Sequence, residues 1–299
     1  MFICSLSSTI FYLSHYSIYF CDEKNLSVNP FGCGWMGKQL LDIIFSSEKR
    51  KRVLLLLQDG PKETNTLLRS LDTKRKSLLP QIKVLEDNNL VFHYKDTYEL
   101  TSIGKVVVDK MSPLVDNIEL FESDIDYWGT HRLDFVPAVL LKEMRQVKNC
   151  TILQPSLTEL FELNRRFMEE TYNSSHLCTV TTLFHPQFRD IYLKLVDSGV
   201  KISLIISDEL FRKTKAEKYS DLKQIMNQKS VDIFVYNKPI KLASFSVNNH
   251  SLILRLLATE GQYDNRYLIL EGQGAVNWGK EVFDYYLKES MPITEIQQA

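Results

Sequence analysis

The sequence predicts a two-domain α/β protein, with an N-terminal α+β domain followed by a C-terminal mixed α/β sheet. Its 299 residues exceed the usual size of a single domain. Three helical patterns precede a hairpin pattern between residues 47 and 100, and strand and helix patterns alternate beyond residue 150. Hydrophobic residues make up 44% of the chain and charged residues 24%, which allows two buried cores and excludes a disordered or fibrous protein.

The charges are distributed unevenly, although the formal net charge is only -1. Residues 36–110 contain 14 Lys or Arg and 10 Asp or Glu, whereas residues 111–299 contain 21 and 25. A basic front and an acidic back favour a polyanionic partner for the front. The alternative is a chance scatter of surface charges.

Residues 1–35 differ from the rest because they are rich in Ser and aromatic residues and carry no charge before position 22. The apolar stretch 10–20 is interrupted by Ser14 and Ser17 and falls short of the roughly 20 residues that a membrane span needs. It also lacks the basic start of a signal peptide. We expect a non-native or disordered leader, with Met36 as the native start and no membrane association. A weak signal anchor is the alternative.

The cysteines show neither a CxxC pair nor a His at zinc-ligand spacing. This pattern predicts reduced thiols in a cytoplasmic protein that holds no metal and no cofactor. The five cysteines are Cys4, Cys21, Cys33, Cys150 and Cys178.

Residues 36–110 are predicted to form the N-terminal domain, and its first two helices are marked by their ends. The first helix begins at Ser47, a favourable N-cap residue, and stops at the Gly-Pro pair at 60–61. The second covers residues 62–71.

A third helix is predicted over residues 74–87. Leu78, Ile82 and Leu85 recur at helical spacing and are expected to face the core, which leaves a basic face opposite. Pro80 costs a helix interior ~3 kcal/mol, so the helix should start near residues 75–77 or kink there.

Residues 90–100 show the pattern of a strand, a turn and a second strand, and three helices followed by a hairpin make a winged helix. The run Leu85-Glu86-Asp87-Asn88-Asn89-Leu90-Val91, with this hairpin and Leu100-Thr101-Ser102-Ile103-Gly104 after it, resembles archaeal and bacterial winged helix-turn-helix transcriptional regulators of the ArsR-like kind. The resemblance covers about residues 40–110.

The resemblance implies that the third helix enters the major groove of double-stranded DNA while the hairpin touches the backbone or minor groove. Lys and Arg at a helix N-terminus suit this role, because they neutralise phosphates and can contact guanine. The alternative is a protein-docking module without DNA binding. The candidate DNA-contacting residues are Lys62, Lys74, Arg75, Lys76, Ser77, Gln81, Lys83, His93 and Lys95.

A connector or dimerisation helix is predicted over residues 111–130. Its apolar residues, together with one just before it, follow a heptad spacing, which predicts a homodimer that reads two DNA half-sites. The alternative is that the same stripe packs on the chain's own domains, since Pro113 should break or kink the helix. The stripe consists of Val107, Met111, Leu114, Ile118, Phe121 and Ile125.

Residues 131–299 are predicted to form an α/β regulatory, or sensor, domain. Strands are expected at 150–153, 176–181, 200–206, 231–236, 241–247, 251–258 and 267–270. Helices are expected at 156–172, 186–197, 208–228 and 275–290.

Three stretches of this domain resemble the C-terminal regulatory domain of methanogen transcriptional regulators: Thr182-Leu183-Phe184-His185-Pro186, Gly261-Gln262-Tyr263-Asp264 and Ala275-Val276-Asn277-Trp278-Gly279. The resemblance covers about residues 130–290 and implies a layout similar to phospholipase D-like sensor domains that have lost catalysis. The H-x-K motif of such enzymes is absent, because His93 is followed by Lys95 but Leu100 stands where the motif needs Asp. We therefore expect a regulator and not an enzyme; the alternative is a phosphodiesterase-like domain tethered to the winged helix.

A small-molecule effector is expected at polar groups near the strand ends of this domain. The alternative is structural, with the aromatic residues in the core, the carboxylate in a turn and the histidine capping a helix. The candidate effector-binding residues are His185, Arg255, Tyr263, Asp264, Asn277 and Trp278. The predicted function is a cytoplasmic, dimeric, DNA-binding transcriptional regulator with a ligand-sensing or oligomerisation domain.

Overall fold

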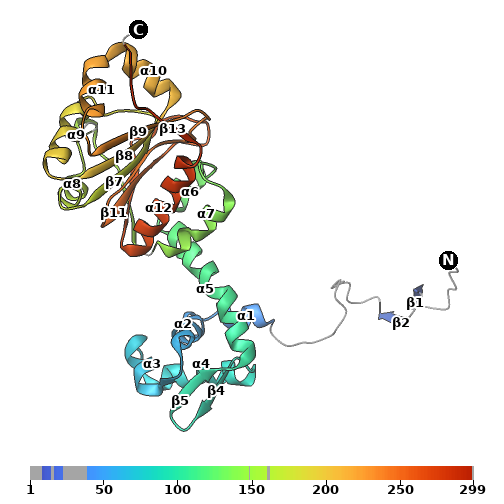
Figure 1. Cartoon of the computed structure of the whole chain (residues 1–299). Helices are drawn as coiled ribbons and strands as arrows, with labels where there is room; N and C mark the ends of the chain where they lie inside the picture. Colours follow the sequence, from blue (N-terminus) through green and yellow to red (C-terminus); the bar gives the residue numbers. More distant parts are fainter. Residues whose placement is uncertain (1–8, 15–16, 23–38, 148, 160–161, 298–299) are drawn as a thin grey trace.

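A helix of 21 residues, α5 (Ser102–Glu122), joins the N-terminal domain to the C-terminal sheet (Figure 1). The computed structural model describes residues 9–14, 17–22, 39–147, 149–159 and 162–297. Within 1–35 it describes only strands β1 (Thr9–Ser14) and β2 (Ser17–Asp22), which pair antiparallel. The expected leader otherwise lies outside the described residues, as does the expected start at Met36.

The first predicted helix has the expected starting signal, and one further helix precedes it. Helix α2 (Glu48–Leu56) begins after Ser47, whose Oγ accepts a hydrogen bond from the Arg50 N–H at 3.5 Å. A 3-10 turn, η1 (Leu57–Asp59), leads to Gly60. A short helix that was not predicted, α1 (Leu40–Phe45), precedes α2.

The second helix is shorter than predicted. Lys62 and Glu63 form strand β3, and α3 covers only Thr64–Ser70. The backbone of β3 pairs with Thr97 and Tyr98, so partners distant in sequence prevent these two residues from joining the helix. The Thr64 hydroxyl donates to the Asp96 carboxylate at 2.6 Å, which holds the start of α3 at this sheet.

The third helix and the hairpin match the prediction. Helix α4 (Arg75–Asp87) starts where Pro80 requires, and Leu78, Ile82 and Leu85 are at most 1% exposed. Strands β4 (Val91–Tyr94) and β5 (Thr97–Leu100) form the hairpin, and the sheet order is β3-β5-β4.

Helix α5 belongs to two cores. Thr101 Oγ1 accepts a hydrogen bond from the Gly104 N–H at 3.0 Å and starts the helix. Val108, Met111 and Val115 lie in the core of the N-terminal domain, and Leu120 lies in a core of the C-terminal domain. Pro113 does not end the helix, contrary to one of the two expectations.

The C-terminal domain contains an eight-stranded mixed sheet in the order β13-β9-β8-β7-β10-β11-β12-β6. Strands β7, β8 and β9 are parallel, and the other neighbours pair antiparallel. The bounds are β6 Asn149–Leu153, β7 His176–Thr181, β8 Lys201–Ser207, β9 Val231–Tyr236, β10 Leu242–Val247, β11 Ser251–Leu256, β12 Tyr267–Glu271 and β13 Ser290–Pro292.

Two separate cores cover the two faces of this sheet. Helix α12 (Gln273–Leu287) packs in one core, with contributions from α6 (Ile125–Thr130), α7 (Ala138–Lys142) and the turn η2 (Glu143–Gln146). Helices α8 (Arg165–Tyr172), α9 (Phe188–Asp197), α10 (Asp208–Glu217) and α11 (Tyr219–Met226) pack in the other.

Two predicted helices of this domain were too long. The pattern at 156–172 corresponds to a 3-10 turn, η3 (Leu157–Glu159), and to α8, because the N-cap Asn164 accepts a hydrogen bond from the Phe167 N–H at 2.9 Å and starts the helix late. The pattern at 208–228 divides into α10 and α11, because Lys218 has φ -136° and ψ 40°, outside the helical range.

Candidate functional site

The N-terminus of α4 carries exposed cations on one side of the N-terminal domain. Lys74 is the N-cap residue, and Arg75, Lys76 and Ser77 form the first turn, all of them exposed. The N–H groups of a first turn lack intrahelical partners and give this end a partial positive charge. The arrangement therefore suits an anion.

A further cation, Lys49, was missed by the sequence reasoning. It comes from α2, and its Nζ contacts the Ser77 hydroxyl at the start of α4. No local pattern links two residues 28 positions apart, but Lys49 does belong to the basic run at the start of α2. Arg75 is partly neutralised, since Asp96 lies 3.7 Å from its guanidinium.

The candidates further along α4 are already engaged. Lys83 forms ion pairs with Asp87 at 3.0 Å and Glu86 at 3.8 Å, and the hydrogen bond that its ammonium donates to Asp87 raises the pKa of Lys83. Gln81 accepts a hydrogen bond from the Ser47 hydroxyl at 3.1 Å. These two side chains are less available to a partner than the cations at the helix start.

The hairpin carries the remaining candidates. His93 contacts the Glu86 carboxylate, and Lys95 stands in the turn with φ +56° and its ammonium 5.3 Å from the centre of the Tyr94 ring. Lys62 is half-buried on β3. Tyr94, which was not predicted, is 71% exposed beside the turn.

The predicted heptad stripe is divided by the fold. Met111 is 4% exposed in the core of the N-terminal domain, and Phe121 packs edge-on against Trp128 at 5.3 Å between ring centres. Leu114 and Ile118 are 51% and 41% exposed. The stripe therefore leaves these two central residues available to a second chain, while Met111 is not available.

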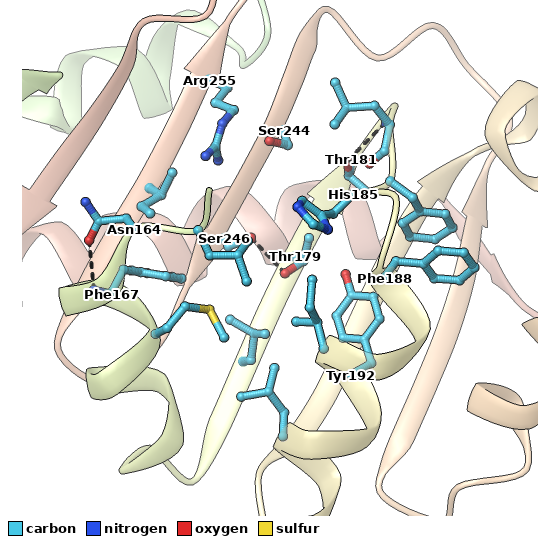
Figure 2. A pocket seen from close by; sticks show the side chains of 18 of the residues that line it. Asn164, Phe167, Thr179, Thr181, His185, Phe188, Tyr192, Ser244, Ser246 and Arg255 are labelled. Carbon is cyan, nitrogen blue, oxygen red and sulfur yellow. Dashed lines mark hydrogen bonds between the residues drawn. The ribbon is translucent and has the colours of Figure 1, made fainter. Parts of the chain in front are cut away.

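A cavity of about 400 Å³ lies between α8, α9 and the strands β7, β10 and β11 (Figure 2). Three of the six predicted effector residues line it: His185, Arg255 and Tyr263. His185 comes from the loop before α9, Arg255 from β11 and Tyr263 from the loop after β11, so the fold brings together three residues that are distant in sequence. Most of the remaining lining is apolar, including Phe167, Met168, Leu177, Ile191 and Leu195.

A polar row crosses the sheet at the floor of this cavity. Strand register places Ser244 directly opposite Thr181 on one side and Arg255 on the other. Two residues along, Ser246 lies opposite Thr179, and their hydroxyls hydrogen bond at 2.9 Å. Sequence reasoning missed these hydroxyls; the alternation in Ser244-Phe245-Ser246 was the available signal, because Phe245 is buried in the opposite core.

Arg255 is the cation of this row. Its guanidinium lies 4.7 Å from the centre of the Tyr267 ring, and among the described residues it has no carboxylate within ion-pair distance. Burial lowers the pKa of Arg255, and the neighbouring phenols of Tyr263 and Tyr267 oppose that shift. A guanidinium remains charged at neutral pH even so.

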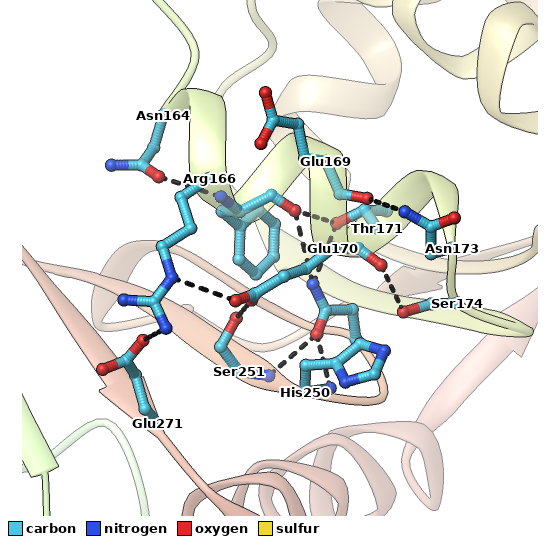
Figure 3. A network of polar contacts seen from close by, with 12 residues as sticks. Asn164, Arg166, Glu169, Glu170, Thr171, Asn173, Ser174, His250, Ser251 and Glu271 are labelled. Carbon is cyan, nitrogen blue, oxygen red and sulfur yellow. Dashed lines mark hydrogen bonds and ion pairs between the residues drawn. The ribbon is translucent and has the colours of Figure 1, made fainter.

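A polar network holds α8 in place as one wall of the cavity (Figure 3). Asn248, which is 1% exposed, donates to Thr171 Oγ1 at 3.0 Å and accepts from the N–H groups of His250 and Ser251 at 2.7 and 2.8 Å. The Glu170 carboxylate contacts the Ser251 hydroxyl. The same contacts fix the β10–β11 turn, so the wall and the floor of the cavity are joined.

The other three predicted effector residues lie outside the lining. Asp264 pairs with Arg266 at 2.8 Å and lies 3.2 Å from the buried His131. Asn277 is exposed on α12 and accepts a hydrogen bond from Gln273 at 2.8 Å.

Trp278 is 1% exposed, in the core on the opposite face of the sheet. Its indole N–H donates to the Leu140 carbonyl at 2.8 Å. The cavity therefore brings together three of the six candidates, and the position of Trp278 agrees with the structural alternative for that residue.

The described part of the chain contains three cysteines: Cys21 on β2 and the half-buried free thiols Cys150 and Cys178. Burial raises the pKa of the Cys150 thiol to about 12 and that of Cys178 to about 11. Within the part of the chain that the structure describes, no cluster of three or more His, Cys, Asp or Glu side chains is placed to hold a metal ion. No helix in the described ranges is both long and apolar enough to cross a membrane.

Comparisons with known proteins show that this chain is similar to methanogenesis regulatory proteins. Two family models, both for the methanogenesis regulatory protein FilR1, match this chain in sequence order. The model of the N-terminal domain matches residues 38–119, and the model of the middle domain matches residues 160–289.

A curated relative has the same name, methanogenesis regulatory protein FilR1 from Methanothrix harundinacea (strain 6Ac). It is 22% identical over 259 residues, which cover 85% of this chain. The chain spans only 58% of the length of that relative.

Two solved structures show weaker similarity. The archaeal chromatin protein TrmBL2 matches with a TM-score of 0.39 and 15% identity, covering 85% of this chain and 97% of that chain. Nuc from Salmonella typhimurium, a phospholipase D family member, matches with a TM-score of 0.36 and 9% identity, covering 49% of this chain and all of its own.

Proposed function

We propose that this chain is a cytoplasmic transcriptional regulator that binds double-stranded DNA through a winged-helix domain at residues 36–110 and a small-molecule effector through its C-terminal domain. The observation that supports the DNA partner is the group of cations around the start of α4, namely Lys49, Lys74, Arg75 and Lys76. The name of the curated relative, a regulatory protein, favours regulation over catalysis.

The cations differ in their freedom to meet phosphate. Lys74 and Lys76 are exposed and have no ion pair among the described residues, whereas Arg75 is close to Asp96 and Lys83 is paired with Asp87. Each phosphate that a cation neutralises releases counterions, so the affinity falls with salt. Lys74 and Lys76 should therefore contribute most to the salt dependence of DNA binding.

We place the homodimer contact on the exposed side of α5. Ile103, Leu114 and Ile118 are 56%, 51% and 41% exposed, and their positions 103, 114 and 118 fall on one side of a helix. Burial of such a stripe against its symmetry mate would remove apolar surface from water. A dimer of this kind would present two α4 helices to DNA.

The test is the salt dependence of binding to a random-sequence duplex. Replacing Lys74 and Lys76 with Ala should reduce the slope of log affinity against log salt by about 2, at ~0.9 for each lost phosphate contact. The matched control replaces Lys213 and Lys229, exposed lysines of the C-terminal domain, and should leave the slope unchanged. An unchanged slope in the first variant, with the circular dichroism spectrum of the native fold, would favour a docking module that does not bind DNA.

A further inference from the structure

The cavity floor holds the cation of the polar row, Arg255. Arg255 has the Tyr267 ring beside it at 4.7 Å, but no carboxylate of the described residues pairs with it. Arg255 is half-buried, and a cation that is partly removed from water without an opposite charge beside it is unfavourable unless something else compensates it. An anionic group delivered by a ligand would supply that compensation.

Hydrogen-bond donors beside Arg255 point to where the anionic group would lie. Ser244 is 8% exposed, stands opposite Arg255 in the strand register, and its hydroxyl makes no hydrogen bond to any described residue. Thr181, on the far side of Ser244, is by contrast already bonded to the Leu183 backbone. Figure 2 shows Ser244 between Arg255 and Thr181 on the cavity floor.

The charge balance of the lining limits the anion. Among the described lining residues, Arg255 and Glu162 are the charged side chains, and Glu162 is exposed. One guanidinium matches one negative charge in a bidentate geometry, whereas a phosphate dianion would meet too little positive charge and the nearby Glu162 carboxylate. A monocarboxylate fits this balance.

The rest of the cavity lining favours a ligand whose remaining part is apolar. Beyond the polar row, the walls are formed by aliphatic and aromatic side chains of α8, α9 and β7, among them Phe167, Leu177 and Ile191. A sugar or nucleotide would leave most of its hydroxyl groups unpaired against such walls. At the ~30 Å³ that a water-sized group occupies, the cavity has room for on the order of ten to fifteen non-hydrogen atoms.

We infer that the cavity binds a small monocarboxylate with an apolar body, whose carboxylate contacts Arg255 and Ser244 while its hydrocarbon part packs against α8 and α9. This inference rests on the proposed effector role of the C-terminal domain. The ligand belongs to one chemical class, organic acids of medium chain length or with one aromatic ring.

The test compares octanoate with octan-1-ol and octylammonium, which share its chain but not its charge. Calorimetric titration of the full chain should give an affinity for octanoate about tenfold or more above that for either analogue. Octanoate should also raise the unfolding temperature, because it binds only the folded state.

Variants locate the anion at the polar row. Arg255→Gln should weaken octanoate binding about tenfold or more and leave octan-1-ol binding unchanged, whereas Arg255→Lys should retain part of the preference for the anion. Ser244→Ala should weaken octanoate binding about threefold. If Arg255→Gln does not fold, this second variant still tests whether the carboxylate lies at the polar row. Arg212→Gln, on the exposed side of α10, is the control and should have no effect.

Equal binding of octanoate and octan-1-ol, no binding of octanoate at millimolar concentration, or full octanoate affinity in folded Arg255→Gln or Ser244→Ala would overturn the inference. The salt slope of DNA binding, measured on the same preparations, separates the two proposals. A normal slope without anion preference refutes only the ligand class. Anion preference without DNA binding leaves the ligand class standing and refutes the proposed regulator.

Discussion

Replacing Gly104 with Ala should destabilise the N-terminal domain, because α5 approaches Leu90, the residue just before β4, too closely for a methyl group. A Cβ at position 104 would lie 2.0 Å from the Leu90 carbonyl oxygen. Ordinary contact begins at 3.4 Å, so the helix and this carbonyl would have to separate by about 1.4 Å, the difference between the two distances. That movement would also strain the 3.0 Å hydrogen bond from the Thr101 N–H to the same oxygen.

The magnitude follows from three opposing effects at this position. Overpacking costs about 1–3 kcal/mol, a weakened backbone hydrogen bond costs about 1 kcal/mol, and the helix preference of Ala over Gly returns about 1 kcal/mol. The free energy of unfolding should therefore fall by about 1–3 kcal/mol.

Urea denaturation followed by far-ultraviolet circular dichroism measures this change. Hydrogen exchange should place the loss in α4 and α5 and spare the parallel strands of the C-terminal sheet. Gly129→Ala is the matched control, because a Cβ there meets no atom within 4 Å; it should be neutral or stabilising by up to about 1 kcal/mol. A Gly104→Ala protein as stable as wild type, with the same urea dependence, would refute the close-packing argument.

Replacing Leu114 and Ile118 with Glu should convert a dimer to monomers in sedimentation velocity, since it places charges on the exposed stripe of α5; a folded double variant that remains dimeric would move the interface elsewhere. Asn248→Ala should reduce the free energy of unfolding by about 2–4 kcal/mol, because it leaves several buried partners unpaired, whereas the exposed Asn173→Ala should change it by under about 1 kcal/mol. Urea melts of both variants check this, and equal losses would contradict it. Finally, burial raises the pKa of the Cys178 thiol from 9.0 to about 11, and this lowers the fraction of thiolate at neutral pH about 100-fold. Peptide-resolved alkylation should therefore be far slower in the native than in the urea-unfolded protein, and equal rates would show the thiol to be accessible.

The parts of the fold that the sequence predicted are those with local signals. Helix α4 and the hairpin follow from the spacing of Leu78, Ile82 and Leu85 and from the turn at Lys95, all within one stretch of chain. Strand β3 was not predictable, because two residues become a strand only through pairing with β5. Asn164 was a local signal for the start of α8 that was overlooked.

The candidate sites were predictable to different degrees for the same reason. The cations of α4 are contiguous in sequence, so the basic surface was predicted apart from Lys49. A heptad stripe gives the side of a helix but not its partner, and Met111 faces its own domain. At the cavity, Arg255 was predicted but its neighbour Ser244 was not, since strand register brings them together.

Because α5 is part of two cores, a change in its orientation in one core changes the position of its other end. With Met111 fixed in one core and Leu120 in another, the helix cannot slide in either without disturbing packed side chains. At 1.5 Å per residue its 21 residues span about 30 Å, so a tilt of about 10° at one end displaces the other by about 5 Å. The position of the N-terminal end of α5 is therefore sensitive to small changes in the angle at which its C-terminal end packs.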